Sequence, residues 1–499
     1  MSNLSELIPA GGGQNNTDFV ADGGITSGKP VILTAAGKAA QVAGSVGSET
    51  LGSPVDASGA ATIGYGVVGV YDAASGKMVI VYVKTGGVYA VVGTISGTVI
   101  SWGTPVTAYS GTGDDKPAIC YDSVTEQVII AYRVNPDTGT YVITGKVSGT
   151  TISFGTAVAV DSTVNMSEFT VAYNVADSKG LVIYGSQGLS SNSGRAKVIT
   201  VTGTAISLGT QYNWQTSGYV NNNHYCSTYD SNAGSIVFAN QSTANSGKAA
   251  VFTISGTNVS AGTFTQYTTG NTTGTSITYD STAQKVVTAS RQTTTTYGYA
   301  AVGTVSGTSI SFGSPVAFNS SQVAAASVCC AYGGDSANVT NILFAPDTDN
   351  YLYYINGTVS GTSISFNTEA RAYSDNATSP RAGISTATSG KVLFIINPSS
   401  TVGGLIDNYI YGAVLQNVVT TTNLTSTNLL GIASAAILDT ATGTINTWGS
   451  RNEVQTGLTI ASDYYVQTDG TITTASASPA QLIGEAITAT QINIKDYTG

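Results

Sequence analysis

A short phrase of sequence returns through most of this chain at intervals of 51 to 54 residues. It joins an apolar residue, a glycine and a small hydroxyl residue, as in Trp102-Gly103-Thr104. The glycine stands at positions 52, 103, 155, 209, 262 and 313, and a seventh copy has Asn367 instead. A fixed period in this range is typical of solenoids, propellers and arrays. The repeat therefore constrains the architecture before any single element is considered.

One repeat predicts one four-stranded antiparallel sheet. In the second repeat, residues 117–122, 127–133, 141–147 and 150–160 are rich in β-branched and aromatic residues, with turn-forming residues between them. Ser148-Gly149 is a two-residue hairpin signal, because glycine tolerates positive φ. The glycine of the phrase predicts a bulge. No segment keeps a 3.6-residue period, so we expect almost no helix.

Four-stranded units of this length predict an all-β chain with a seven-bladed β-propeller over residues 47–420. The first copy of the phrase, near residue 51, precedes the first inner strand, near Val67. The last unit has inner strands, a hairpin expected at Gln416-Asn417 and no clear copy of the phrase. We therefore expect residues 48–57 to form the outer strand of the last blade, which leaves no open sheet edge. An open β-array or a β-helix is the competing interpretation.

The segments outside the repeats, residues 1–46 and 421–499, are each too short for a core of their own. If the two ends of the propeller meet, these segments meet as well and can form one small β domain. Gly457-Leu458-Thr459, the run 463–470 ending in the Asp469-Gly470 turn, and the closing run 483–494 resemble a small β domain of tailed-phage virion proteins. Residues 27–38 are similar to its opening hairpin.

The resemblance implies a virion surface protein on a tail or a capsid, in contact with other virion proteins. It also implies a homotrimer, as is common among such proteins. It does not cover the propeller and identifies no ligand. We expect assembly in the host cytoplasm, because residues 1–12 lack the basic start and apolar core of a signal peptide.

Composition argues against several partners. The net charge is −10 and only 9% of residues are charged, which disfavours binding to nucleic acid, where clustered Lys and Arg are needed. The same charge disfavours anionic membranes, and no stretch approaches 18 apolar residues, so we expect no membrane insertion. We also expect no metal and no cofactor.

Few residues could support catalysis. His224 is the only histidine, so it is the only imidazole base, and a loop histidine without a role is the alternative interpretation. The acidic pairs Asp114-Asp115 and Asp347/Asp349 are expected to be solvated turns rather than catalytic pairs. The four cysteines precede the repeated tyrosine of the inner strands by one to three residues. We expect them to be small buried thiols between blades; they are Cys120, Cys226, Cys329 and Cys330.

The remaining candidate is a binding surface on the loops, which vary most between repeats. Tyr212, Trp214, Tyr219 and His224 lie in or beside the longest of these loops. Tyr and Trp offer stacking area with polar tips, which suits sugar rings, although ordinary loop packing is the alternative. We predict a non-enzymatic virion structural protein whose propeller attaches to a host-surface glycan or decorates the capsid or tail. A propeller glycoside hydrolase or depolymerase is the second hypothesis.

Overall fold

The structure is a computed structural model, and it describes residues 15–46, 49–59, 63–111, 113–134, 139–161, 165–187, 193–215, 225–241, 246–324, 328–333, 339–346, 351–373, 381–387, 390–398, 409–417, 420–468, 470–474 and 481–495. Over these residues the chain is built from antiparallel strands without a helix, which confirms the all-β class. No helix in the described part is therefore long and apolar enough to span a membrane. Contacts divide the chain into two compact units, residues 49–417 and residues 1–48 with 418–499.

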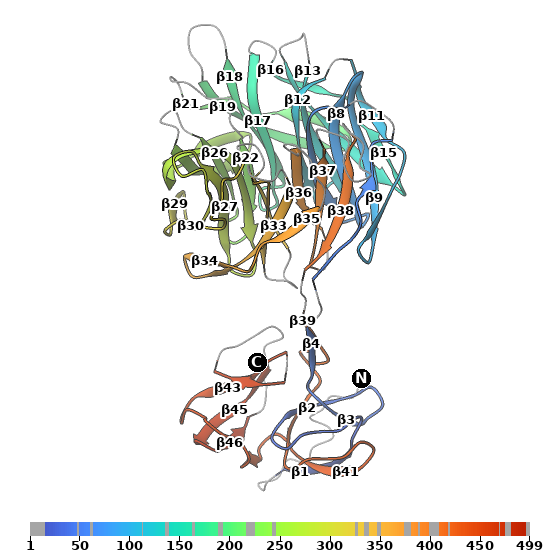
Figure 1. The fold of residues 1–499 in the computed structure, drawn as a ribbon, viewed down its shortest axis with the longest axis vertical. Helices are drawn as coiled ribbons and strands as arrows, with labels where there is room; N and C mark the ends of the chain where they lie inside the picture. The colour runs from blue at the N-terminus through green and yellow to red at the C-terminus, as the bar shows by residue number, and fades with distance from the viewer. Residues whose placement is uncertain are drawn as a thin grey trace. The chain divides into compact units, whose positions relative to one another are not determined.

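The larger unit repeats one arrangement of strands from sheet to sheet (Figure 1). Three long strands lie side by side, and an outer strand in two short pieces pairs with the third. The first sheet holds β7 (Ile63–Asp72), β8 (Lys77–Lys84), β9 (Gly87–Ser96), β10 (Val99–Trp102) and β11 (Val106–Ser110). The second holds β12 (Gly113–Asp122), β13 (Gln127–Val134), β14 (Thr140–Ser148), β15 (Thr151–Phe154) and β16 (Val158–Asp161). The third holds β17 (Asn165–Asn174), β18 (Lys179–Gln187), β19 (Ser193–Thr202), β20 (Ala205–Leu208) and β21 (Tyr212–Gln215).

The fourth and fifth sheets share the long strand β26 (Thr265–Asp280), whose first half pairs with β24 and whose second half pairs with β27. The fourth holds β22 (Cys226–Asp230), β23 (Ser235–Gln241), β24 (Ser246–Ser255) and β25 (Asn258–Ala261). The fifth continues with β27 (Lys285–Gln292), β28 (Gly298–Ser306), β29 (Ser309–Phe312) and β30 (Val316–Ala317). The sixth holds β31 (Cys329–Tyr332), β32 (Thr340–Phe344), β33 (Leu352–Ser360), β34 (Ser363–Phe366) and β35 (Ala370–Tyr373).

The seventh sheet takes its outer strand from the other end of the unit. It holds β36 (Arg381–Thr386), β37 (Lys391–Asn397) and β38 (Tyr411–Gln416), and β38 pairs with β5 (Thr50–Leu51) and β6 (Val55–Asp56). The hairpin expected at Gln416-Asn417 is wrong, because the partner of β38 is not the segment that follows it. The first strands of successive sheets touch, and β36 touches β7. A buried apolar cluster joins the seventh and first sheets, as in Leu393 and Ile395 against Met78 and Ile80.

The repeated phrase has a packing explanation. The predicted hairpin glycines, such as Gly149 and Gly203, have φ between 58° and 62°, as their turns require. The glycine of the phrase instead lies against the next sheet: a Cβ on Gly103 would sit 1.9 Å from the carbonyl oxygen of Thr150, which follows that sheet's hairpin glycine. The same contact pairs each of the six phrase glycines with a threonine carbonyl one sheet further on. Asn367 departs from the pattern, because no hairpin turn joins β38 to β5.

The Tyr-Asp pair that ends the inner strands also ties sheets together. Asp122 Oδ1 accepts hydrogen bonds from the backbone N–H groups of Val124 and Thr125 and so closes the turn after β12. The hydroxyl of Tyr121 accepts a hydrogen bond from the N–H of Ala74 in the turn of the preceding sheet. Tyr229 and Tyr279 repeat this contact.

The smaller unit combines both ends of the chain. One sheet has the order β1 (Asn16–Val20), β41 (Thr442–Asn446), β40 (Leu429–Ala433), β2 (Pro30–Leu33) and β3 (Ala39–Gln41). A second has the order β42 (Arg451–Asn452), β46 (Gln491–Ile494), β45 (Gln481–Thr488), β43 (Asp463–Val466) and β44 (Ile472–Thr473). β4 (Gly44–Val46) pairs with β39 (Thr420–Thr422). Ile32 and Ile432 share a core with Val466 and Ile483, so the two sheets pack together.

Candidate functional site

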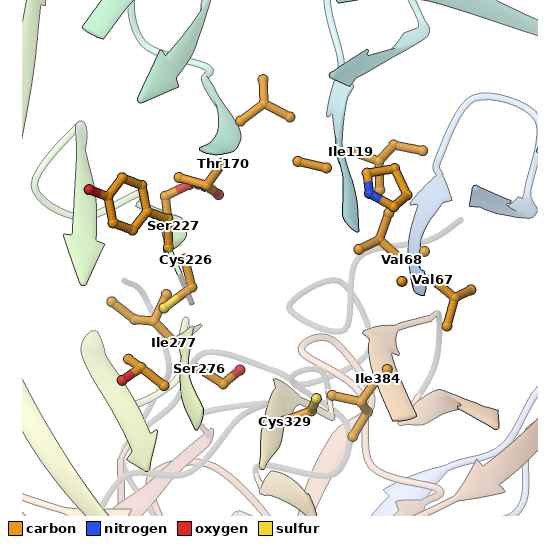
Figure 2. Close-up of a pocket in the computed structure, with 18 of the residues that line it drawn as sticks. Val67, Val68, Ile119, Thr170, Cys226, Ser227, Ser276, Ile277, Cys329 and Ile384 are labelled. Atoms are coloured by element: carbon orange, nitrogen blue, oxygen red, sulfur yellow. Dashed lines mark hydrogen bonds between the residues drawn. The ribbon is translucent and has the colours of Figure 1, made fainter. Parts of the chain in front are cut away.

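The innermost strands of all seven sheets contribute residues to one cavity of about 510 Å³ (Figure 2). Its wall is uneven. Thr170, Ser227 and Ser276 bring hydroxyls to one side, while Val68 and Ile384 lie opposite with other aliphatic side chains. Such a wall could hold a small neutral molecule that has one apolar and one hydroxylated face.

Some of these hydroxyls already bind neighbouring inner strands to one another. The Thr170 and Ser227 hydroxyl oxygens are 2.9 Å apart, and this hydrogen bond links β17 to β22. Ser276 Oγ accepts a hydrogen bond of 3.0 Å from the backbone N–H of Cys330, which links β26 to β31. Since adjacent inner strands share no backbone ladder, these side chains help to hold the wall together.

The described wall of the cavity does not supply the chemistry of a glycoside hydrolase. Hydrolysis requires two carboxyl groups flanking the scissile bond. Of the described residues that line the cavity, Glu168 alone carries a carboxylate. The side chains of Asp114 and Asp115, together with Asp347 and Asp349, lie outside the described residues.

The cysteines are free thiols, and the expectation that all are buried is only partly correct. Cys120 and Cys330 are buried, whereas Cys226 and Cys329 are half-buried; Cys226, Cys329 and Cys330 line the cavity. Burial raises the pKa of Cys330 to about 12, so that thiol stays protonated near neutral pH and is a poor nucleophile. No group of three His, Cys, Asp or Glu side chains within the described ranges is arranged to hold a metal ion.

The predicted loop residues have packing roles where they are described. Trp214 donates its indole N–H to the Arg195 carbonyl oxygen at 3.0 Å and packs on Tyr225 and Phe238. The hydroxyl of Tyr212 accepts a hydrogen bond of 3.3 Å from the Ala261 N–H. Both rings are partly buried against one apolar cluster. Tyr219 and His224 lie outside the described residues. Ligand binding by these four residues stays a prediction.

The position of Trp214 is also aromatic in the fourth and fifth sheets, and in all three the ring covers a glycine of the third strand. Its ring lies over Gly194, where a Cβ would sit 2.2 Å from the ring. Tyr267 and Phe318 cover the equivalent glycines of the fourth and fifth sheets, Gly247 and Gly298. The sequence alone suggests a loop residue at Trp214, because the glycine that its ring covers is 20 residues earlier in the chain.

A second repeated position was missed and is more exposed. The third strand of each sheet carries a large side chain in the same register, and in five sheets it is a tyrosine. These are Tyr89, Tyr141, Tyr299, Tyr353 and Tyr411, with Arg195 and Lys248 in the third and fourth sheets. Tyr89, Tyr141, Tyr299 and Tyr353 are half-buried. Their spacing near the repeat length was the available signal.

The strands on either side decide what the ring of such a tyrosine can contact. On the inner side Tyr141 stacks on the buried ring of Tyr132, with ring centroids 6.0 Å apart. On the outer side its cross-strand partner is Ala159, and the partner of Tyr299 is Ala317. Because alanine covers little of an aromatic face, we infer that these two rings keep one side open. We call the seven equivalent positions the tyrosine row.

In the third sheet the row residue is used for an ion pair. Arg195 Nη1 lies 2.8 Å from Asp161 Oδ2, which belongs to β16 of the second sheet. Asp161 is nearly buried, and it also accepts a 3.5 Å hydrogen bond from the Tyr184 hydroxyl. Burial, followed by the charge of Asp161, raises the pKa of Tyr184, which therefore stays neutral. Row residues thus face the preceding sheet.

No family model matches the chain, and no curated protein matches it. Among solved structures, AofleA from Arthrobotrys oligospora has 11% identity and a TM-score of 0.41, covering 70% of this chain and 97% of that one. A six-bladed β-propeller lectin of Aleuria aurantia with a fucose recognition mode has 12% identity and a TM-score of 0.39, covering 63% and 99%. A Lactobacillus plantarum protein has 10% identity and a TM-score of 0.43, covering 67% and 95%. Likeness at this level defines neither a family nor a ligand.

Proposed function

We propose that residues 49–417 form a seven-bladed β-propeller that binds carbohydrate through its tyrosine row without cleaving it. The repeated sheets, the contact of β36 with β7 and the apolar cluster between the seventh and first sheets support a closed ring. The tyrosine row is the single observation that carries carbohydrate binding. An aromatic ring with one open face and a polar hydroxyl tip stacks on the apolar face of a sugar and hydrogen-bonds at its edge.

Repetition strengthens this proposal. Equivalent rings recur in five sheets and are half-buried in four of them, so a polymer with repeating sugars could engage more than one ring, and weak single contacts would add up to useful avidity. The net charge of −10 disfavours the alternative in which stacked rings bind bases of a nucleic acid.

The proposal includes a place for the protein, on the surface of a tailed-phage virion. The resemblance of both chain ends to a small phage β domain supports it, and these ends form one compact unit. In this proposal the smaller unit docks on other virion proteins of a tail or capsid, in a homotrimer. The larger unit contacts a host-surface glycan. If the larger unit binds no host receptor, the proposed role is decoration of the capsid or tail.

Binding of the full-length labelled chain to a glycan array and to candidate host cells tests the function. We expect saturable binding that Tyr141→Ala and Tyr299→Ala together reduce at least about tenfold and that Tyr141→Phe retains, because phenylalanine keeps the ring. Tyr465→Ala, at a half-buried tyrosine of the smaller unit, is the matched control. If the wild-type chain binds no glycan and no cell, the receptor role is wrong and decoration becomes the better proposal.

A further inference from the structure

The fourth sheet carries a row of three polar side chains that face the third sheet. Asn240 and Lys248 are direct cross-strand partners on β23 and β24. Tyr225 immediately precedes β22, whose Cys226 pairs with Ala239, so Tyr225 lies beside Asn240. Trp214 of the third sheet is 6.1 Å from the Tyr225 ring, measured between ring centroids. We call Tyr225, Asn240, Lys248 and Trp214 the third–fourth cluster.

Two buried atoms of this cluster have no hydrogen-bond partner in the described chain. They are the Tyr225 hydroxyl and Asn240 Oδ1, in residues that are 7% and 4% exposed. Leaving a buried polar atom unpaired costs free energy, which a ligand that bonds to the atom would recover. Burial, and then the negative charge of Glu168, raises the pKa of Tyr225 well above its ordinary value, so its hydroxyl stays neutral and can donate a hydrogen bond.

Lys248 differs from its equivalent in the third sheet. Arg195 meets the carboxylate of Asp161, which pairs with Thr140 in the second sheet. The residue that occupies the corresponding place opposite Lys248 is Gln215, which pairs with Gly194 and is uncharged. Lys248 is half-buried, and no carboxylate partner is found for it among the described residues. Asp161 thus neutralises Arg195, whereas no described carboxylate neutralises Lys248.

We propose that the third–fourth cluster binds an acidic saccharide, with its carboxylate at Lys248 and its hydroxyls at Asn240 Oδ1 and the Tyr225 hydroxyl. The proposal rests on the carbohydrate-binding function above and names its charged subsite. Lys248 and Asn240 are neighbours on adjacent strands, so one ligand could reach both the ammonium group and the amide oxygen. Because the two unpaired atoms are buried, binding in this proposal requires the flexible four-carbon side chain of Lys248 to move outward.

Oligomers of uronic acids and their methyl esters test the charge requirement, because each pair differs only in the carboxylate. With galacturonate, glucuronate and mannuronate oligomers, we expect calorimetry on the full chain to show at least about tenfold tighter binding of an acid than of its ester. Lys248→Gln should bring the affinities for the acid and for its ester within about twofold of each other, and raised salt should do the same in the wild type. Lys285→Gln, at a half-buried lysine of the fifth sheet, should preserve the preference.

Asn240→Leu distinguishes a ligand-binding site from a local packing defect. Removing an unpaired buried oxygen should raise the urea midpoint of the free protein while weakening acid binding at least about fivefold. Glycan binding without preference for any acid over its ester overturns the proposed acidic-sugar site but is consistent with the carbohydrate-binding function. A preference that survives Lys248→Gln also overturns it. Failure to bind every glycan, neutral or acidic, rejects the function itself.

Discussion

Gly103→Ala tests why the repeated phrase contains glycine. The new Cβ would lie 1.9 Å from the Thr150 carbonyl oxygen, whereas ordinary contacts of a Cβ begin near 3.4 Å. The obstacle is backbone, so the two sheets must separate rather than rotate a side chain. Overpacking of this kind costs about 1–3 kcal/mol. Weakening of the 2.8 Å hydrogen bond from the Gly103 N–H to the Val92 carbonyl adds about 1 kcal/mol.

One term opposes these costs, because alanine has less freedom than glycine in the unfolded chain and gains about 0.5–1 kcal/mol. The net expectation is a loss of about 2–3 kcal/mol in the free energy of unfolding. Urea unfolding followed by tryptophan fluorescence measures it. Trp102 packs between the first and seventh sheets, so its fluorescence reports the unfolding of the larger unit.

Asn367→Ala is the matched control, because residue 367 occupies the same place but has no hairpin turn beside it and is exposed. We expect a change within about 0.5 kcal/mol. Gly97→Ala controls for backbone conformation alone, since Gly97 has φ of 61° and open space around its Cα, and should cost about 1 kcal/mol. Equal midpoints for Gly103→Ala and Asn367→Ala would refute the packing explanation.

Three further changes follow from the packing. Ser178→Gly should raise the free energy of unfolding in urea by about 0.5–1 kcal/mol, because Ser178 has φ of 54° where two equivalent turns carry Gly76 and Gly234. A lowered free energy of unfolding contradicts this. Trp214→Ala should cost about 3 kcal/mol and Trp214→Phe distinctly less, if the ring serves to cover Gly194; calorimetric melting compares them. Burial raises the pKa of Tyr132 to about 12, so folding favours its neutral form: the resulting stability is present below about pH 10 and is lost as pH rises through 12. Tyrosinate absorbance of Tyr132→Phe against wild type measures this, and titration of Tyr132 near pH 10 in the folded protein would contradict it.

Much of the fold could be predicted from local signals. The all-β class follows from the strand patterns, and the hairpin glycines have the positive φ that their Ser-Gly turns require. These features depend on residues a few positions apart, so the sequence displays them directly. The hairpin expected at Gln416-Asn417 failed because the partner of β38 lies more than 350 residues away, at β5. No local pattern reports such a distant pairing.

The candidate site was less predictable because it depends on cross-strand register. Trp214 reads as an exposed loop aromatic until its contact with Gly194 is known. The tyrosine row could have been detected in the sequence, since Tyr89 and Tyr141 are one repeat apart. Its small cross-strand partner, Ala159 opposite Tyr141, is identified only once the strands are paired. The unpaired oxygen of Asn240 requires the whole three-dimensional packing.

Departures from the repeat then separate architecture from function. A position that obeys the repeat, such as Gly103, is explained by the contact between sheets. Two departures also have an architectural cause: Asn367 stands where the next turn is missing, and Arg195 stands where Asp161 supplies a counter-charge. Lys248 is the departure for which the described residues provide no such cause, because the uncharged Gln215 stands at the place of Asp161 and two unpaired polar atoms lie on or beside the neighbouring strands. A half-buried cation that nothing in the packing requires is better explained by a ligand, and this is why the charged subsite is placed there rather than at any other member of the tyrosine row.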